Sequence, residues 1–144
     1  MRRFILSVLL VLLLALPLLS AEKTYGNVTL RPADVVKVYD GDTITVNIPS
    51  FPPIIGKEIS VRIYGIDTPE MKGGTVREKE LAIKARALVV ERISKAKEIE
   101  LRNLRRDKYF RILAEVYVDG ESIAEVLIRE NLGRAYFGDK KQPW

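Results

Sequence analysis

Three short clusters hold the side chains of this sequence that could do chemistry. They are Asp40-Gly41-Asp42-Thr43, the segment from Arg62 to Asp67-Thr68-Pro69-Glu70, and Arg105-Arg106-Asp107-Lys108-Tyr109-Phe110-Arg111. The carboxylates of Asp42, Asp67 and Glu70 are hard oxygen donors, which suit Ca²⁺ or Mg²⁺. Arg62 and Arg111 are permanently charged, and each can bind a phosphate through two donors. Together these residue types suit chemistry on a phosphate ester.

Hydrolysis of a phosphodiester bond would use all of these groups. Attack by water builds charge on the equatorial oxygens, so the transition state needs a cation, guanidinium groups and a base. The chain has neither His nor Cys, which excludes Ser-His-Asp triads, His-metal nucleases, thiol catalysis, thiolate zinc sites and disulfides. A glutamate base has an unperturbed pKa of about 4.3. It is therefore weak unless a metal acidifies the water or the site raises its pKa.

Each cluster also has a purely structural interpretation. Asp-Gly is the usual signal of a hairpin turn, so the first cluster could simply join two strands. The second could be a solvated strand end stopped by Pro69, although Pro69 also fixes the backbone between Thr68 and Glu70 and so aims two acids from one turn. The third could be a solvated hairpin tip, although basic residues interleaved with rings suit a phosphate-bearing polymer.

Hydrophobic periodicity predicts the elements that position these clusters. We expect strands over 34–48 (interrupted at 40–42), 58–66, 98–104 and 111–118, a loop at 49–53, a charged turn at 105–109, and helices over 77–96 and 121–130. The longer helix has Leu81, Ala85 and Leu88 on one stripe, which we expect to be buried. Arg62 and Asp67 have odd spacing and would face opposite sides of a strand, unless Gly65 bends it.

The order of these elements predicts the fold class. Three strands, a helix, two strands and a second helix do not alternate as a parallel sheet requires, so the expected class is α+β, mainly β. Five strands with a helix after the third fit the OB-fold, here an antiparallel five-stranded barrel with two helices packed on it.

The first 21 residues have the composition of a targeting segment. A basic start, an apolar run and Ala21 predict a secretory signal peptide over 1–21, with an uncleaved anchor as the alternative. The formal charge is +5, and removal of Arg2 and Arg3 leaves +3, a mild bias toward anionic partners. We expect a lead-in at 22–34, the main domain at 35–138 and a short tail at 139–144. The expected location is secreted, extracellular or in the cell envelope.

Taken in order and spacing, the three clusters resemble the staphylococcal nuclease (thermonuclease) family from about Val35 to Gly138. The resemblance rests on Asp40-Gly41-Asp42-Thr43, on Arg62 with Gly65-Ile66-Asp67-Thr68-Pro69-Glu70, and on Asp107-Lys108-Tyr109 with Arg111. It implies an OB-type barrel and calcium-dependent, endonucleolytic hydrolysis of DNA and RNA with little sequence specificity, in which the 5′ oxygen leaves and 3′-phosphate ends remain.

The resemblance also implies roles for single residues. Asp42 and Asp67 match carboxylate ligands of one Ca²⁺, and Thr68 matches a main-chain carbonyl ligand. Glu70 matches the proposed general base, and Arg62 and Arg111 match the guanidiniums on the scissile phosphate. The substrate-binding residues it implies are Lys108 and Tyr109 on a terminal phosphate, and Tyr136 or Phe137 stacking on a base.

This chain departs from the family pattern at several places. Phe110 stands where the family usually has Gly, and a positive φ there would strain the turn before Arg111. The Pro-rich loop at 49–56 is longer than a tight hairpin, and the ending Gly138–Trp144 could lay a basic strip and a ring against the barrel. The alternative function is a non-catalytic OB-fold module that binds nucleic acid and is tethered to the cell envelope.

Overall fold

The alternation of apolar and polar residues along the chain produces a strongly bent sheet, described here for residues 22–144 in a computed structural model. The strands are β1 (Val28–Leu30), β2 (Val35–Val38), β3 (Thr43–Val46), β4 (Ile59–Ile63), β5 (Gly65–Asp67), β6 (Ile99–Arg106), β7 (Ile112–Val118), β8 (Glu121–Ser122) and β9 (Arg134–Tyr136). The helices are α1 (Pro53–Gly56), α2 (Val76–Ser94) and α3 (Ile123–Arg129), with 3-10 turns η1 (Pro32–Asp34) and η2 (Lys108–Phe110).

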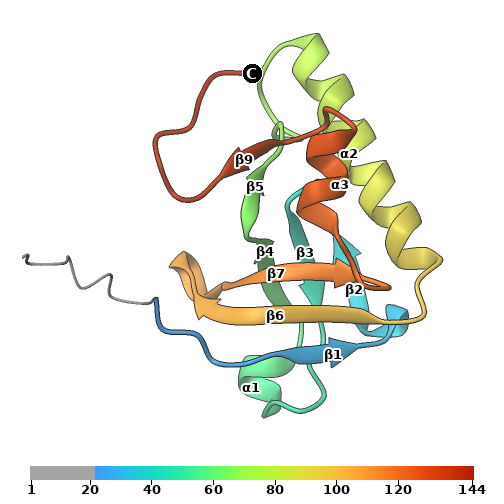
Figure 1. The fold of residues 1–144 in the computed structure, drawn as a ribbon, viewed down its shortest axis with the longest axis vertical. Helices are drawn as coiled ribbons and strands as arrows, with labels where there is room; N and C mark the ends of the chain where they lie inside the picture. The colour runs from blue at the N-terminus through green and yellow to red at the C-terminus, as the bar shows by residue number, and fades with distance from the viewer. Residues whose placement is uncertain (1–21) are drawn as a thin grey trace, which may run out of the picture.

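The main sheet has the strand order β1-β6-β7-β4-β3-β2, with β8 added to β7, and β5 pairs with β9 separately. In Figure 1, β1, β6 and β7 run horizontally, whereas β3 and β4 run roughly vertically. The sheet therefore curls around its core. The expected α+β class with an OB-type barrel is confirmed. One pairing differs from the expected antiparallel arrangement, because β4 and β7 are parallel. The chain crosses through α2 and β6 between them, which lets both strands run the same way.

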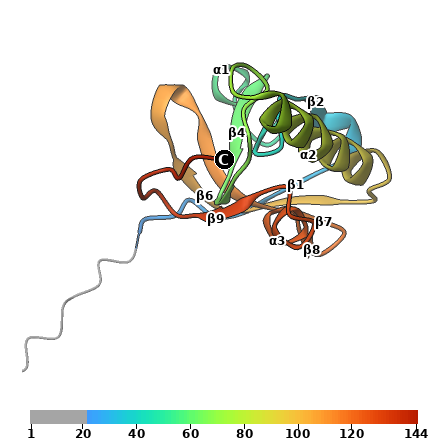
Figure 2. The same ribbon diagram turned by 90° about the horizontal axis from the view of Figure 1, so that it is seen from above.

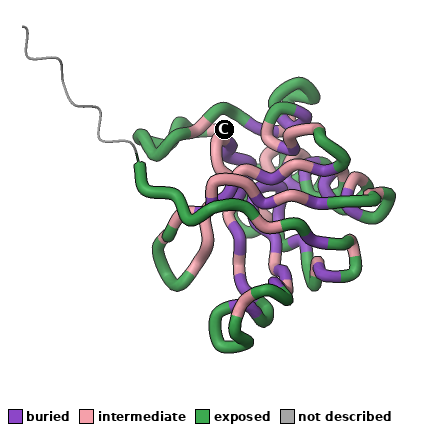
Figure 3. The backbone as a smooth tube through the Cα atoms, turned by 60° about the horizontal axis from the view of Figure 1, so that its bottom comes forward, coloured by how far each residue is buried: buried purple, intermediate pink, exposed green. Residues whose placement is uncertain are grey.

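The core lies inside the curl of the sheet, under α2 and α3. Its fully buried side chains are mainly Ile, Leu and Val from alternate strand positions, as in β4, whose residues Ile59, Val61 and Ile63 point inward. Figure 3 shows the buried positions gathered in the centre and the exposed ones in the loops and the tail. The barrel is therefore a packed support, and the polar clusters lie at its rim.

Helix α2 buries Ala85, as expected, but the rest of its buried stripe differs from the expected one. Its buried residues are Ala82, Ala85, Val89 and Ile93, whereas Leu81 and Leu88 are only half-buried. The reason is close approach, because small side chains let the helix axis come near the Asp40–Thr43 turn. The helix begins with a capping box in which the Thr75 hydroxyl accepts from the Glu78 N–H and Glu78 accepts from the Thr75 N–H.

The remaining differences from expectation are small additions. The lead-in contains β1, which pairs with β6, and the Pro-rich loop contains the single turn α1. The segment 1–21, expected to be a signal peptide, lies outside the described residues. No helix within residues 22–144 has the length and apolar character needed to cross a membrane.

Candidate nuclease site

A bend at Gly65 brings Arg62 and Asp67 to the same side of the sheet. Strand β4 ends at Ile63 and β5 begins at Gly65, which has φ +85°, a conformation that favours glycine. The Arg62 Nη2 lies 3.3 Å from the Asp67 Oδ1, and its Nη1 lies 2.7 Å from the Asp42 Oδ1. The expected bend is therefore present, and one guanidinium joins acids that are 25 residues apart.

The Asp40–Thr43 segment is both a hairpin turn and part of the site. It connects the paired strands β2 and β3, as the Asp-Gly signal predicts. The Asp42 carboxylate accepts hydrogen bonds from the Thr43 hydroxyl (2.9 Å) and from the Thr68 backbone N–H (3.0 Å). These contacts fix Asp42 against the Asp67-Thr68 turn, so the two acidic clusters meet.

Negative charge is concentrated at this meeting point. Asp40, which is buried, accepts a hydrogen bond from the Asp42 N–H at 3.1 Å. Burial, followed by the charge of Asp42, raises the pKa of the Asp40 carboxyl to about 7. Burial by itself would lower the pKa of the Arg62 guanidinium. The negative charges of Asp42 and Asp67 outweigh burial and raise this pKa above its ordinary value. The cluster therefore favours cations strongly.

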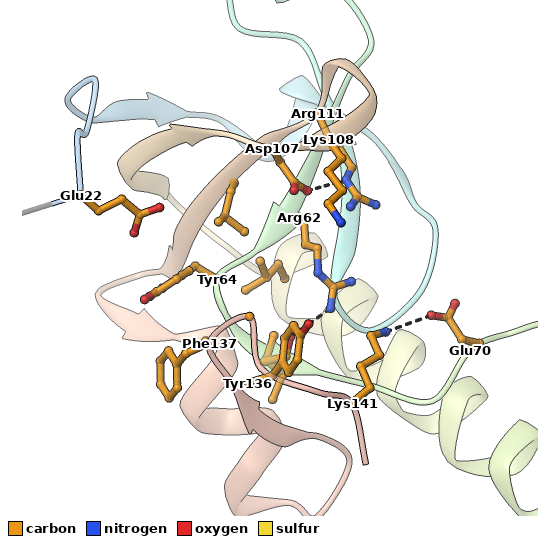
Figure 4. A pocket seen from close by; sticks show the side chains of 15 residues that line it. Glu22, Arg62, Tyr64, Glu70, Asp107, Lys108, Arg111, Tyr136, Phe137 and Lys141 are labelled. Carbon is orange, nitrogen blue, oxygen red and sulfur yellow. Dashed lines mark hydrogen bonds and ion pairs between the residues drawn. The ribbon is translucent and has the colours of Figure 1, made fainter. Parts of the chain in front are cut away.

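A cavity of about 490 Å³ opens beside these acids, and Figure 4 shows the side chains around it. Six of the expected site residues line it: Arg62, Glu70, Lys108, Arg111, Tyr136 and Phe137. A neighbouring cavity of about 280 Å³ is lined by Arg62, Glu70 and Arg111 as well, together with Asp40 and Thr43. The three residues expected to act on a phosphate thus line both cavities.

The turn between β6 and β7 supplies Arg111 and Lys108. The Arg111 Nε donates to the Asp107 carboxylate at 2.7 Å, which holds the side chain at the wall of the cavity (Figure 4). Tyr109 and Phe110 have φ values of 57° and 62°. The position usually occupied by Gly therefore does take a positive φ, and the ion pair with Asp107 keeps Arg111 in place despite it.

The chain after β9 folds back over the acids and brings in a residue that sequence reasoning missed. The Lys141 Nζ lies 2.6 Å from the Asp67 Oδ1 and 3.5 Å from the Glu70 Oε1. Arg134 holds the same segment, donating to the Pro143 carbonyl at 2.5 Å and lying 4.2 Å from the Trp144 ring centre. No motif around Lys141 predicts a role in the site, because the sequence shows only two adjacent lysines that would be expected to face solvent.

Other expected residues lie less centrally. Asp42 and Asp67 are buried beneath Arg62 and do not line the large cavity. The side chain of Tyr109 also does not line it, because this residue is 92% exposed at the hairpin tip. Tyr136 lies with its ring centre 6.0 Å from the Arg62 guanidinium, and Phe137 packs edge-on against Tyr64. Asp40 lines the smaller cavity, although the sequence predicted no role for it within the Asp40–Thr43 cluster.

The donor set fits a hard divalent cation. Asp42 and Asp67 offer carboxylate oxygens next to Thr68, whose buried hydroxyl oxygen has no hydrogen-bond partner within residues 22–144. In the same part of the chain, no three acidic side chains are close enough to enclose an ion by themselves. Calcium accepts backbone oxygens and waters as well as carboxylates, so a mixed set of this kind is suitable. The positions of Arg62 and Lys141 show that the acids already attract cations.

The fold and the site define a class: an OB-type barrel whose rim carries an acid cluster beside two arginines and an exposed glutamate. The sequence comparisons agree with this class. A family model described as "Staphylococcal nuclease homologue" matches residues 60–143. The chain therefore belongs to the staphylococcal nuclease family, which confirms the resemblance.

Three curated relatives are similar over most of this chain. They are "Endonuclease YncB" of Bacillus subtilis (37% identity over 118 residues, 81% of this chain and 51% of the relative), "SPbeta prophage-derived endonuclease YokF" of the same species (37% over 103 residues, 70% and 33%), and "Thermonuclease" of Staphylococcus hyicus (30% over 113 residues, 78% and 63%). The matched region thus spans between a third and two thirds of each relative's length.

Proposed function

We propose that this chain is a nuclease that hydrolyses phosphodiester bonds of DNA and RNA with little sequence specificity. The observation that carries the proposal is that Arg62, Glu70 and Arg111 line two neighbouring cavities together, beside a buried acid pair. The names of the three relatives, all of them nucleases, support it. The geometry supplies groups for charge stabilisation and for proton removal, which is more than a binding module needs.

In the proposed reaction the Arg111 Nη groups and the remaining N–H groups of Arg62 bind the scissile phosphate. Glu70 is the base: its side chain is 61% exposed at the cavity, where its carboxylate can accept a proton from an attacking water. The water oxygen forms a bond to phosphorus as the bond to the 5′ oxygen breaks, and the departing oxygen takes a proton from solvent. The products carry a 3′-phosphate and a 5′-hydroxyl, as the family resemblance implies. Both guanidiniums stabilise the charge that develops on the equatorial oxygens.

We infer that the cation is Ca²⁺, held by Asp42, Asp67 and the Thr68 carbonyl. A bound divalent ion would neutralise phosphate charge and lower the pKa of a nearby water. Asp42 is fixed for this role by its hydrogen bonds from Thr43 and Thr68. Burial raises the pKa of Asp40, and the charges of Asp42 and Glu70 add to this effect; the ion would offset that repulsion.

The test is incubation of the purified protein with single-stranded DNA, with Ca²⁺ or with a chelator. We expect cutting only with Ca²⁺, and products with 3′-phosphate ends. Glu70→Gln should reduce the rate by 10²-fold or more, on the order of the contribution of a general base, and should leave DNA binding largely intact. Binding without cutting by the unmodified protein would instead indicate the non-catalytic module. Equal turnover by Glu70→Gln would remove Glu70 from the mechanism.

We also propose that the protein is exported. The support is the basic start, apolar run and small residue at position 21 in the sequence. Mass measurement of the protein from a producing cell is the test, since cleavage after Ala21 gives a chain that begins at Glu22. A mass that includes residues 1–21 would indicate the anchor alternative.

A further inference from the structure

A third hollow is also lined by Arg111 but not by Tyr136, and the proposed function does not use it. It has a volume of about 400 Å³ and lies between the Pro-rich loop, the start of β4 and the turn between β6 and β7. In Figure 2 that turn and α1 appear next to each other, and residues of both line the hollow. Both segments are places where this sequence departs from the family pattern: Phe110 replaces the usual Gly, and the loop at 49–56 is long.

This hollow is lined by apolar and by charged side chains. The apolar ones are Phe51, Ile55, Ile59, Phe110 and Ile112, and the charged ones are Arg106, Asp107 and Arg111. Phe110 is 72% exposed and Ile55 is 42% exposed. Within residues 22–144, the Phe110 ring is not stacked on another aromatic ring. An exposed aromatic residue held at a positive φ is costly for the fold, since left-handed backbone costs an L-residue about 1–2 kcal/mol.

We propose that this hollow binds a nucleobase of the substrate strand, stacked on Phe110, within one nucleotide of the phosphate held by Arg111. The proposal rests on the nuclease function proposed above. Its occupant is a single-stranded segment of nucleic acid, because an unpaired base is needed to expose a face for stacking.

Continuity with the site supports this occupant. Arg111 and Asp107 line both this hollow and the large cavity, so a strand whose phosphate lies on Arg111 passes the mouth of the hollow. Tyr136 lines the large cavity and Phe110 lines this hollow, so each cavity can take one of the two bases next to that phosphate.

Charge supports the same occupant. Two of the three charged residues that line the hollow, Arg106 and Arg111, are cations that can pair with backbone phosphates, whereas Asp107 is already paired with Arg111. Aromatic platforms next to cationic rims are the usual design for single-stranded nucleic acid, since every base has a face that can stack. The volume is also in the range of small-ligand pockets, about 300–1,000 Å³.

The first experiment locates the base directly. A single-stranded oligonucleotide of 5-iodouracil is bound to the protein in the presence of a chelator, irradiated, and the crosslinked peptides are identified by mass spectrometry. We expect crosslinks at Phe110 or Phe51. Crosslinks restricted to Tyr136 and Phe137 would overturn the proposal but leave the nuclease function intact. A complete failure of the strand to bind or to be cut would count against both.

The second experiment measures the energetic contribution. Phe110→Leu and Ile55→Ser should each weaken oligonucleotide binding and raise KM about tenfold, the lower range of what base stacking contributes. A small nucleoside phosphodiester that lacks the base on the Phe110 side tests whether Arg111 has moved. A loss of turnover on this substrate as large as the loss on the oligonucleotide would overturn the proposal. Ile54→Ser is the matched control, because Ile54 is the neighbouring residue, is 86% exposed and does not line the hollow.

Two further outcomes would reassign the surface. Equal oligonucleotide affinity for Ile54→Ser and Ile55→Ser would show that the hollow is not part of the strand path. Dimerisation, or binding to anionic lipid vesicles, that Ile55→Ser abolishes without any effect on oligonucleotide affinity would assign the patch to a second copy or to a membrane, and would overturn the proposal.

Discussion

At the scale of single residues, Gly41 shows how one missing side chain assembles the acidic site. A Cβ atom at position 41 would lie 2.8 Å from the Ala85 Cβ and 2.8 Å from the Thr68 Cγ2. The turn can therefore approach both α2 and the Asp67-Thr68 segment only because residue 41 has no side chain. That approach is what allows the Thr68 N–H to reach the Asp42 carboxylate.

Gly41→Ala should destabilise the protein and loosen the site together. Overpacking of this kind costs about 1–3 kcal/mol, measurable by urea unfolding, and the displaced Asp42 should lower affinity for Ca²⁺ in calorimetry. Adding Ala85→Gly returns space next to the turn. The double variant should therefore lose less stability than the sum of the two single losses, although glycine lowers the helix propensity at position 85. Unchanged stability in Gly41→Ala would show that the close approach is unimportant.

At the scale of elements, Glu121 joins two helices that flank the barrel. Its carboxylate accepts from the Arg92 Nη1 of α2 at 2.6 Å and from the Arg129 Nη2 of α3 at 2.8 Å. The hydrogen bond from Arg129, aided by the charges of both arginines, lowers the pKa of Glu121 below its ordinary value. The carboxylate thus stabilises the folded state only while it is ionised.

Glu121→Gln should lower the melting temperature slightly at pH 7. Because the folded-state pKa of Glu121 is below the unfolded one, its contribution is complete above the unfolded value and is lost as the pH falls through the folded value. The difference between the variant and the unmodified protein should therefore shrink on acidification. Glu80→Gln, an exposed α2 position, is the control. A difference that grows toward acid pH would contradict the assignment.

The segment after β9 is a second element whose position has consequences. Lys141 places an ammonium on Asp67, one of the carboxylates proposed to bind Ca²⁺. Burial by itself would lower the pKa of Lys141, but the hydrogen bond to Asp67 and the charge of Asp67 raise it. The ammonium therefore stays charged at neutral pH. A divalent ion must compete with it for the same oxygen.

Lys141→Gln should therefore raise affinity for Ca²⁺ about threefold, a modest gain because the lysine is half-exposed and screened by water. Calorimetry measures the affinity. Fluorescence of Trp144, the single tryptophan of the sequence, reports whether the segment moves when Ca²⁺ binds. Lys140→Gln removes the same charge from the neighbouring position and should have a smaller effect. Equal affinities for the two variants would show that Lys141 does not compete.

At the scale of the whole molecule, the buried acidic site destabilises the fold, and a bound cation would offset this destabilisation. Asp40 and Asp42 are buried side by side in a protein of formal charge +5. Ca²⁺ binding to the folded state alone should stabilise the protein by about 2.7 kcal/mol when the ion is 100-fold above its Kd. Urea unfolding with Ca²⁺ and with a chelator, at equal ionic strength, measures this. The gain should disappear in Asp42→Asn, and an equal gain in that variant would place the ion elsewhere.

Much of this protein could be predicted from periodicity and motif chemistry. Alternation in β3 and β4 predicts strands because a half-buried sheet imposes a period of two, and the turn at Asp40-Gly41 follows from Asp-Gly chemistry. The buried stripe of α2 could not be predicted in the same way. Leu81 and Leu88 are more apolar than Ala82, but the space left by the neighbouring turn decides which side of the helix faces inward. Lys141 was missed because its partners lie more than 70 residues away.

The sequence by itself determined the types of group available: acids and arginines in the absence of His and Cys, hydrophobic residues for a barrel, and a Gly65 that permits a bend. Only the tertiary structure decided which of them meet, with Asp42 and Asp67 sharing one guanidinium, Lys141 on the same acids, and Phe110 facing the Pro-rich loop. The reason is physical, since local propensity acts over a few residues, whereas these contacts join distant segments that are brought together by burial of the barrel core.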